Sequence, residues 1–188
     1  MEIIYFLVSS LEEYNDAYGF HNQYFVEEKG FLFAFLIALF VAVVIAAFFY
    51  LFICNVFNRL SKFYVWVIAL FLTVGATLLL TSKVIVGGED ENTGDYTGFY
   101  YSLEDHAGNK REEFAQNQEA QKMVNQEYDQ IMQDLAGSGE EEYKVIDMLY
   151  LTNTILTIFF FILISMLIKG TTKYGIAIPC VWPRKLHF

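Results

Sequence analysis

Three long apolar blocks are the feature of this chain that most constrains its fold. They run from Phe31 to Cys54, from Phe63 to Thr81 and from Met148 to Ile168, and no Asp, Glu, Lys or Arg falls inside any of them. Each block is close to or above the ~20 residues that a helix needs to cross ~30 Å of hydrocarbon. Apolar residues make up 55% of the chain, a share that soluble domains also reach, so their segregation into blocks is what predicts a membrane protein.

Basic residues near the ends of the blocks predict how the chain is oriented. Arg59 and Lys62 lie in the short link between the first two blocks. Four more cations follow the third block, namely Lys169, Lys173, Arg184 and Lys185. Short segments rich in Lys and Arg stay in the cytoplasm. The N-terminus and the segment between the second and third blocks are therefore expected outside, and they carry most of the formal charge of −10.

The predicted fold class is an all-α integral membrane protein of a cell or organelle inner membrane, with three transmembrane helices, its N-terminus outside and its C-terminus cytoplasmic. The expected segments are an exported amphipathic stretch (1–29), a transmembrane helical hairpin (30–82), an acidic exported loop with a long helix (83–146), a third transmembrane helix (147–169) and a cytoplasmic apolar and basic tail (170–188). The two cysteines, Cys54 and Cys180, both fall on the cytoplasmic side, so we predict reduced thiols and no disulfide.

A row of small residues marks the first block. Its members stand one helical turn apart: Gly30, Ala34, Ala38, Ala42 and Ala46. Small residues let helix backbones approach closely in lipid, so the row predicts a helix-packing seam, and the patch around Gly75 in the second helix is its nearest candidate partner. The alternative is that Ala is simply common in membrane helices. If the seam exists, Leu at Ala38 or Ala42 disrupts packing more than Leu at Val41 or Val44.

The exported segment is expected to contain one long helix. A run rich in Glu and Gln extends from about Lys110 to Leu135 and has high helical propensity. Its apolar stripe is thin, so the helix is either docked on a partner or frayed. The aromatic residues that precede it, Tyr96, Phe99, Tyr100 and Tyr101, are interpreted as a packing contact rather than a ligand-stacking site.

Acidic clusters flank this helix and are the candidate partner-docking residues. They are Glu89, Asp90, Glu91 and Asp95 on one side and Glu140, Glu141 and Glu142 on the other. Clustered acids attract a basic exported protein at long range. Solubility of a flexible loop is the competing explanation and carries more weight. A calcium loop is disfavoured, because an EF-hand needs Gly where Asp95 stands and Glu where Tyr101 stands.

Candidate catalytic chemistry is absent from the sequence. No span contains an ionisable residue, and His21, His106 and His187 are isolated in sequence. Asn153 is the strongest hydrogen-bonding side chain inside a predicted span, and we interpret it as an interhelical packing residue rather than a substrate contact. We therefore expect no enzyme activity, no cofactor, no metal and no nucleic-acid partner.

Three functions remain after this exclusion. The preferred hypothesis is a non-catalytic accessory subunit of a multi-subunit membrane complex, of the energy-transducing or secretion type, with other membrane subunits and the bilayer as partners. One alternative is a small homo-oligomeric channel or transporter, whose pore would be lined by Thr73, Thr77, Thr152, Asn153 and Thr157. The other alternative is a subunit that docks a basic exported protein on its acidic loop.

Overall fold

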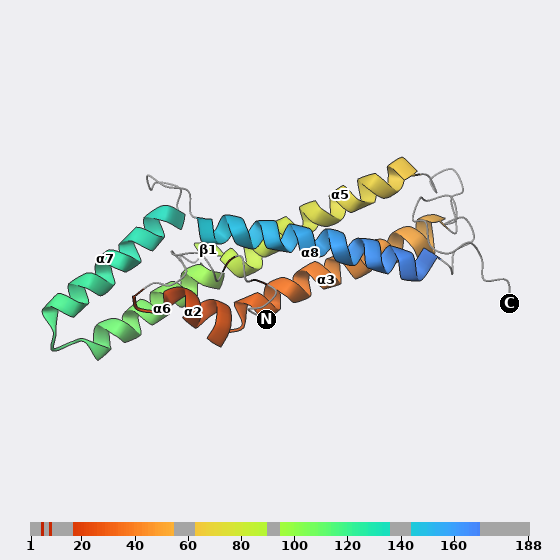
Figure 1. Ribbon diagram of the computed structural model, residues 1–188. Coiled ribbons are helices and arrows are strands. Elements are labelled where there is room, and N and C mark those ends of the chain that lie inside the picture. The colour runs from red at the N-terminus through yellow and green to blue at the C-terminus, as the bar shows by residue number, and fades with distance from the viewer. Residues whose placement is uncertain are drawn as a thin grey trace. The chain divides into compact units, whose positions relative to one another are not determined.

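The computed structural model describes residues 5, 8, 17–54, 63–89, 95–135 and 144–169, and nearly all of them are helical (Figure 1). Three helices are long and apolar enough to cross a membrane: Gly30–Ile53, Phe63–Val86 and Val145–Ile168, each of 24 residues. The prediction of three such helices is confirmed. A helix of this length measures about 36 Å at ~1.5 Å per residue, so each is expected to tilt in a ~30 Å hydrocarbon layer.

The first two spans each combine an α-helix with a final π-helical turn. Helix α3 (Gly30–Ala47) continues as η3 (Phe48–Ile53), and α5 (Phe63–Leu80) continues as η5 (Thr81–Val86). The third span lies within α8 (Lys144–Lys169).

Two of the spans extend beyond the apolar blocks and take in a charge. The second continues past Thr81 and includes Lys83, and the third begins at Val145 and includes Asp147. Both charged side chains are exposed and stand about one turn from the end of their span. The long Lys83 side chain reaches the polar interface from that position, and Asp147 stands in the first turn of its span, so neither charge has to enter the hydrocarbon layer.

The chain divides into two compact units. The hairpin unit comprises Met1–Ala34 and Leu80–Thr152, and the span unit comprises Phe35–Leu79 and Asn153–Phe188. Helices α3 and α8 therefore contribute one end to each unit. We describe the two units separately.

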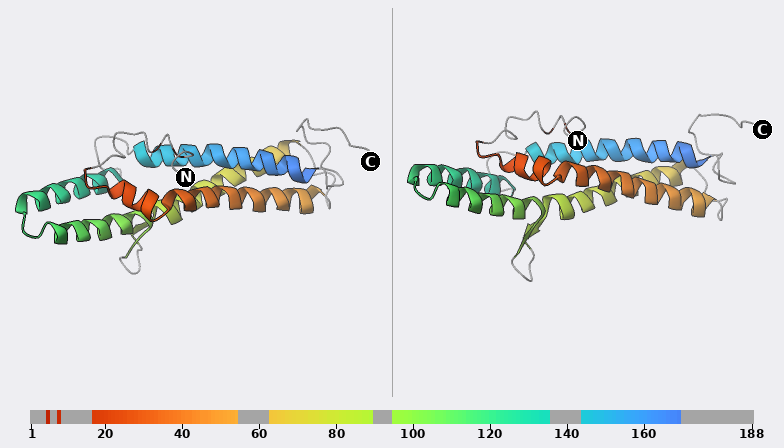
Figure 2. Two further views of the ribbon diagram at one scale, coloured as in Figure 1. Left: turned by 60° about the horizontal axis from the view of Figure 1, so that its bottom comes forward. Right: turned by 90° about the horizontal axis from the view of Figure 1, so that it is seen from below.

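The hairpin unit is built from short elements and one helix pair. A short helix α2 (Phe20–Asn22) runs into the π-helical turn η2 (Gln23–Glu27). Helices α6 (Gly98–Glu113) and α7 (Gln118–Leu135) lie side by side (Figure 2). Between η5 and α6, the strands β1 (Gly88–Glu89) and β2 (Tyr96–Thr97) form a two-residue antiparallel ribbon. This ribbon is the one departure from the expected all-α fold among the described residues.

The single long helix expected from Lys110 to Leu135 is in fact interrupted. A turn over Phe114, Ala115, Gln116 and Asn117 separates α6 from α7. The Asn117 side-chain oxygen accepts hydrogen bonds from the backbone N–H groups of Glu119 and Ala120, both at 3.2 Å. Asn is a favoured N-cap because this contact satisfies donors that the first helical turn leaves unpaired. Helical propensity was thus predicted correctly, but the cap at Asn117 starts a second helix.

The span unit has a core made from all three of its helices. One buried cluster contains residues of α3 and η3, residues of α5 and one residue of α8: Ala42, Ala46, Phe49, Tyr50, Cys54, Trp66, Ala69 and Phe161. Trp66 Nε1 donates a hydrogen bond to Ser165 Oγ at 3.3 Å. The centroids of the Trp66 and Phe161 rings are 5.6 Å apart. Small side chains of α3 therefore share one core with two large aromatic rings.

Candidate functional site in the hairpin unit

Two glycines form the joint where α6 begins. Gly87 has φ +76°, and a Cβ built there would stand 1.9 Å from the Thr97 carbonyl oxygen. Gly98 has φ +60°, and its Cβ would stand 2.7 Å from the Ile85 carbonyl oxygen. Only glycine combines positive φ with such close backbone approach at low cost. The joint therefore depends on both glycines, and it sets where α6 starts.

The segment before the first span packs on α6. The Tyr24 hydroxyl donates a hydrogen bond of 2.7 Å to the Ile85 carbonyl oxygen. Phe99 of α6 lies against the rings of His21, Tyr24 and Phe25 at 5.3 to 5.5 Å between centroids. Burial, and then the nearby Glu28 carboxylate, raise the pKa of the Tyr24 phenol, so it stays protonated and keeps its donor role.

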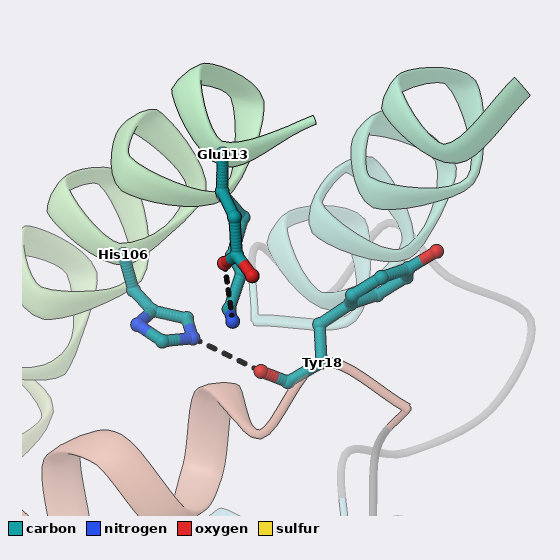
Figure 3. A network of polar contacts seen from close by, with 4 residues as sticks. Tyr18, His106 and Glu113 are labelled. Atoms are coloured by element: carbon teal, nitrogen blue, oxygen red, sulfur yellow. Dashed lines mark hydrogen bonds and ion pairs between the residues drawn. The ribbon is translucent and has the colours of Figure 1, made fainter. Parts of the chain in front are cut away.

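A polar contact at Tyr18 continues this packing along α6 (Figure 3). His106 Nε2 lies 3.0 Å from the Tyr18 carbonyl oxygen, and the His106 and Phe20 rings meet edge to face with centroids 5.3 Å apart. Lys110 follows His106 by one turn of α6 and Glu113 by two, and Lys110 Nζ pairs with a Glu113 carboxylate oxygen at 2.9 Å. Residues 18–25 are thus held along α6 from Phe99 to His106.

Arg111 joins α6 to α7. Its Nε donates a hydrogen bond of 2.6 Å to Asn125 Oδ1, and its guanidinium lies 5.1 Å from the centroid of the Tyr128 ring. The Gln121 side-chain amide donates to the Arg111 carbonyl oxygen at 2.9 Å. Val124 and Ile131 of α7 are buried in the same unit. Part of the thin apolar stripe of α7, Val124 and Ile131, is therefore buried within the chain, whereas Tyr128 and Leu135 stay partly exposed.

Replacing Arg111 with Lys is expected to loosen the α6–α7 pair. An ammonium cannot reproduce the planar guanidinium that both bonds Asn125 and stacks on Tyr128. We expect a loss of about 1 to 2 kcal/mol, which corresponds to roughly tenfold faster amide exchange in α7. Hydrogen exchange read by mass spectrometry measures this directly. Lys122→Arg, at an exposed position of α7, is the control and should leave exchange unchanged. Equal exchange in wild type and Arg111→Lys would show that Arg111 does not hold the pair.

The outer surface of the helix pair is acidic. Residues 98–135 contain eight acidic and three basic residues. Two of the three cations, Lys110 and Arg111, have intramolecular partners. Six of the acids are exposed: Glu104, Asp105, Glu112, Glu113, Glu119 and Asp129. Glu113 is paired with Lys110, and the other five outnumber the cations of the helix pair, so its surface is predominantly negative.

The acidic residues singled out from the sequence are not those of α6 and α7. Asp90 and Glu91 fall outside the described residues, as do Glu140, Glu141 and Glu142. Glu89 lies in β1 and Asp95 is exposed just before β2. The acids on α6 and α7 were not singled out, because the sequence alone does not show which of them share a surface.

The row of small residues is buried along its whole length. Ala34, Ala38, Ala42 and Ala46 are 0% exposed, whereas interleaved Phe40 and Phe48 are exposed. Gly30 has a different neighbour from the one expected: a Cβ there would stand 3.0 Å from the Tyr24 ring. The start of the row therefore packs against η2, within the hairpin unit.

The expected contact at Gly75 is not formed within the described chain. Gly75 is exposed, and a Cβ built there would meet no atom within 4 Å. The buried face of α5 instead carries Ala69, Thr73 and Thr77, each four residues after the last. Four-residue spacing places Gly75 on another face of the helix.

The hydroxyls of the polar span residues bond to their own helices. Thr73 donates to the Ala69 carbonyl, Thr77 to the Thr73 carbonyl and Thr157 to the Asn153 carbonyl, at 2.7 to 3.0 Å. These bonds satisfy the hydroxyl groups within single helices. These residues, Thr152 and Asn153 are all buried within the chain. Side chains buried in this way have little surface from which to line a pore between copies.

Sequence reasoning missed the histidines and the start of the chain. His21 and His106 are isolated in sequence, yet both pack against rings of another segment. The spacing of Phe99, Leu103 and His106 at i, i+4 and i+7 on one helix face is the signal that could have found α6. In the N-terminal amphipathic stripe, Ile4, Leu7, Leu11 and Tyr14 lie outside the described residues, as does the tail 170–188.

Metal and cofactor chemistry gains no support from this geometry. Within the described ranges, no group of three or more His, Cys, Asp or Glu residues is placed to hold a metal ion. Comparison of the chain with protein-family models, with curated proteins and with solved structures finds no match to any of them.

Proposed function

We propose that this protein is a non-catalytic accessory subunit of a multi-subunit membrane assembly, and that its hairpin unit docks a basic partner. The observation that carries the proposal is the separation of charge on α6 and α7. Six acids of the helix pair are exposed; one of them, Glu113, is paired with Lys110, and Arg111 is bound to Asn125 and Tyr128. A preformed, negatively charged surface on a membrane anchor favours fast encounter with a positively charged protein.

Two apolar surfaces contribute little to the proposal. The alanine row is buried in the chain, and Val124 and Ile131 of the α7 stripe are buried in their own unit. The proposal therefore rests on the surface of the hairpin unit, with the positive-inside rule placing that unit on the exported side. The homo-oligomeric channel remains an alternative, which the burial of its expected pore residues disfavours.

Charge neutralisation tests the docking surface. In one variant the helix acids Glu104, Asp105 and Asp129 are replaced by their amides. In a matched variant the loop acids Glu140, Glu141 and Glu142 are replaced in the same way. Association of the full chain with its partner is followed by crosslinking in native membranes at low and high salt. We expect the helix variant to lose about tenfold in association rate at low salt and the loop variant to lose less.

Two results would contradict the proposal. Gentle solubilisation that recovers only a lone monomer, with no crosslinked product, would exclude an accessory subunit. An association whose rate and salt dependence are the same in wild type and both variants would exclude an electrostatic docking surface. Ion flux through the purified, reconstituted protein would instead favour the channel.

A further inference from the structure

The start of the first span, the end of the second span and the start of α6 meet at one level of the hairpin unit. The centroid of the Phe25 ring lies 4.9 Å from that of Phe31, at the start of the first span, and 5.3 Å from that of Phe99 in α6. A Cβ built on Gly98, the first residue of α6, would stand 2.7 Å from the carbonyl oxygen of Ile85, in the last turn of the second span. Helix α6 therefore begins where the second span ends, without an intervening stretch of chain.

The length of the spans fixes which layer of a bilayer this level occupies. Each span has 24 residues and so measures about 36 Å at ~1.5 Å per residue. At a tilt of about 20° it still covers about 34 Å along the membrane normal, against ~30 Å of hydrocarbon. The ends of the spans therefore lie in the headgroup layer, and the start of α6 lies there with them.

The distribution of charge along α6 matches this depth. Residues 98–103 include no charged residue, whereas residues 104–113 contain six. Six helical residues extend about 9 Å, and the headgroup layer is about 5 to 8 Å thick on each side of the bilayer. The charges therefore begin where a helix that starts at the end of a span leaves the headgroup layer for water.

Three tyrosines at this level keep part of their surface exposed. Tyr101 is 59% exposed in the first turn of α6. Tyr96 and Tyr100 are partly exposed, and their rings stack with centroids 6.0 Å apart and planes at 15°. Phe99, between them in the chain, is buried. Exposed tyrosines are concentrated at membrane–water interfaces, because the ring is apolar and the hydroxyl is polar.

We propose that Tyr96, Tyr100 and Tyr101, the interface tyrosines, anchor the start of α6 in the lipid headgroup layer at the end of the second span. Continuity with that span identifies lipid as the occupant, because the rings stand at the level where the surface of the span passes from hydrocarbon to water. Lys83, exposed in the last turn of the same span, adds a cation to this level. Tyr and Lys at span ends are the side chains that fix tilt and rotation.

A depth measurement on the full chain in phosphatidylcholine nanodiscs tests the proposal. A nitroxide is attached to a single cysteine introduced by Val84→Cys, Tyr101→Cys or Glu112→Cys, each in a Cys180→Ser background. Cys54 is buried, and the Cys180→Ser protein without a new cysteine measures residual labelling. Oxygen dissolves preferentially in hydrocarbon and a nickel chelate stays in water, so the ratio of their collision rates with the nitroxide reports its depth.

We expect the label at Tyr101 to lie within about 5 Å of the depth of the label at Val84, since only three residues separate Tyr101 from the joint at Gly98. Glu112 is the matched position. Both residues are exposed, and eleven residues turn a helix by about 1,100°, which is three full turns plus about 20°. The label at Glu112 should collide mainly with the nickel chelate and lie up to ~16 Å further out.

A second label tests whether the Tyr101 ring holds α6 in place. The label is attached through Glu104→Cys, which is exposed one turn beyond Tyr101. Tyr101→Ser should move this label toward water by about 3 Å, roughly half of the headgroup layer. Tyr101→Trp should keep the depth, because Trp is also an interfacial ring. Glu112→Ser is the control and should leave the depth unchanged.

Four outcomes would overturn the inference. A label at Tyr101 that collides mainly with the nickel chelate, as at Glu112, would place the ring in water. A label at Tyr101 shielded from both probes would show that a protein covers it. Oxygen-dominated collisions at both Tyr101 and Glu112 would show that α6 lies along the membrane. An unchanged Glu104 label in Tyr101→Ser would show that the glycine joint alone holds α6.

The inference goes beyond the proposed function and does not depend on it. It requires that the spans lie in a bilayer, whereas the accessory function requires a partner protein. Recovery of a lone monomer would contradict the accessory function and leave the depth of Tyr101 unchanged. Conversely, a label at Tyr101 in water would contradict the anchor while a crosslinked complex could still form.

Discussion

Replacing Gly87 with Ala is expected to unfold the joint between the second span and α6 while the three spans stay helical. The new Cβ would lie 1.9 Å from the Thr97 carbonyl oxygen, and φ at this residue is +76° with ψ −147°. That backbone region is essentially open to glycine alone and costs ~1 to 3 kcal/mol for other residues. The collision with backbone adds to this cost, because β2 cannot move without parting from β1.

We therefore expect a total loss of roughly 3 to 5 kcal/mol in the stability of the hairpin unit. The measurement is amide exchange and limited proteolysis of residues 87–113 in the detergent-purified protein. Gly98→Ala should behave alike, since its Cβ would meet the Ile85 carbonyl oxygen at 2.7 Å. Gly108→Ala is the matched control: it lies inside α6 in open space and should stabilise the helix by about 0.5 to 1 kcal/mol. Equal protection in Gly87→Ala and Gly108→Ala would contradict this account of the joint.

Replacing Ala42 with Leu is expected to destabilise the span unit. Ala42 is 0% exposed and belongs to the cluster that contains Trp66 and Phe161. Three added carbons have no space there, so helices must shift or the rings must leave their rotamers. Overpacking of this kind costs about 1 to 3 kcal/mol. Thermal unfolding in detergent, followed through Trp fluorescence, measures the loss.

The control for this substitution lies two residues further along α3. Val44 is 47% exposed, so Val44→Leu should change stability by less than ~0.5 kcal/mol. Val41 does not serve as a control, although its place outside the alanine row suggested it, because it is only 6% exposed. Equal losses at Ala42 and Val44 would show that the alanine row reflects composition and not packing.

Local propensities explain which helices could be recognised in advance. The spans are visible because hydrocarbon requires ~20 consecutive apolar residues, and no tertiary contact is needed to read that. The run that became α7 was recognised for the same kind of local reason, its helical propensity. The break at Asn117 was missed, although its amide cap is also local, because the surrounding Glu and Gln residues continue the helical pattern.

The candidate site was much less predictable. Arg111 of α6 lies on the Tyr128 ring of α7, and no sequence pattern shows that the two meet. Tyr24 and the Ile85 carbonyl are 61 residues apart, and their hydrogen bond depends on the glycine joint placing η5 beside η2. The acids predicted to dock a partner were chosen by clustering in sequence, whereas the structure decides which acids of α6 and α7 are exposed.

The sequence by itself determined that this chain has three helices long and apolar enough to cross a membrane, a small-residue row on the first of them and an acidic segment between the second and third. These features follow from composition within single segments, where desolvation of the backbone and the pitch of a helix leave few choices. Only the tertiary structure decided that the alanine row is buried in the chain, that part of the α7 stripe is buried in the hairpin unit and that Arg111 is engaged inside the unit. Those outcomes depend on contacts between segments that are far apart in the sequence, so no single segment determines them.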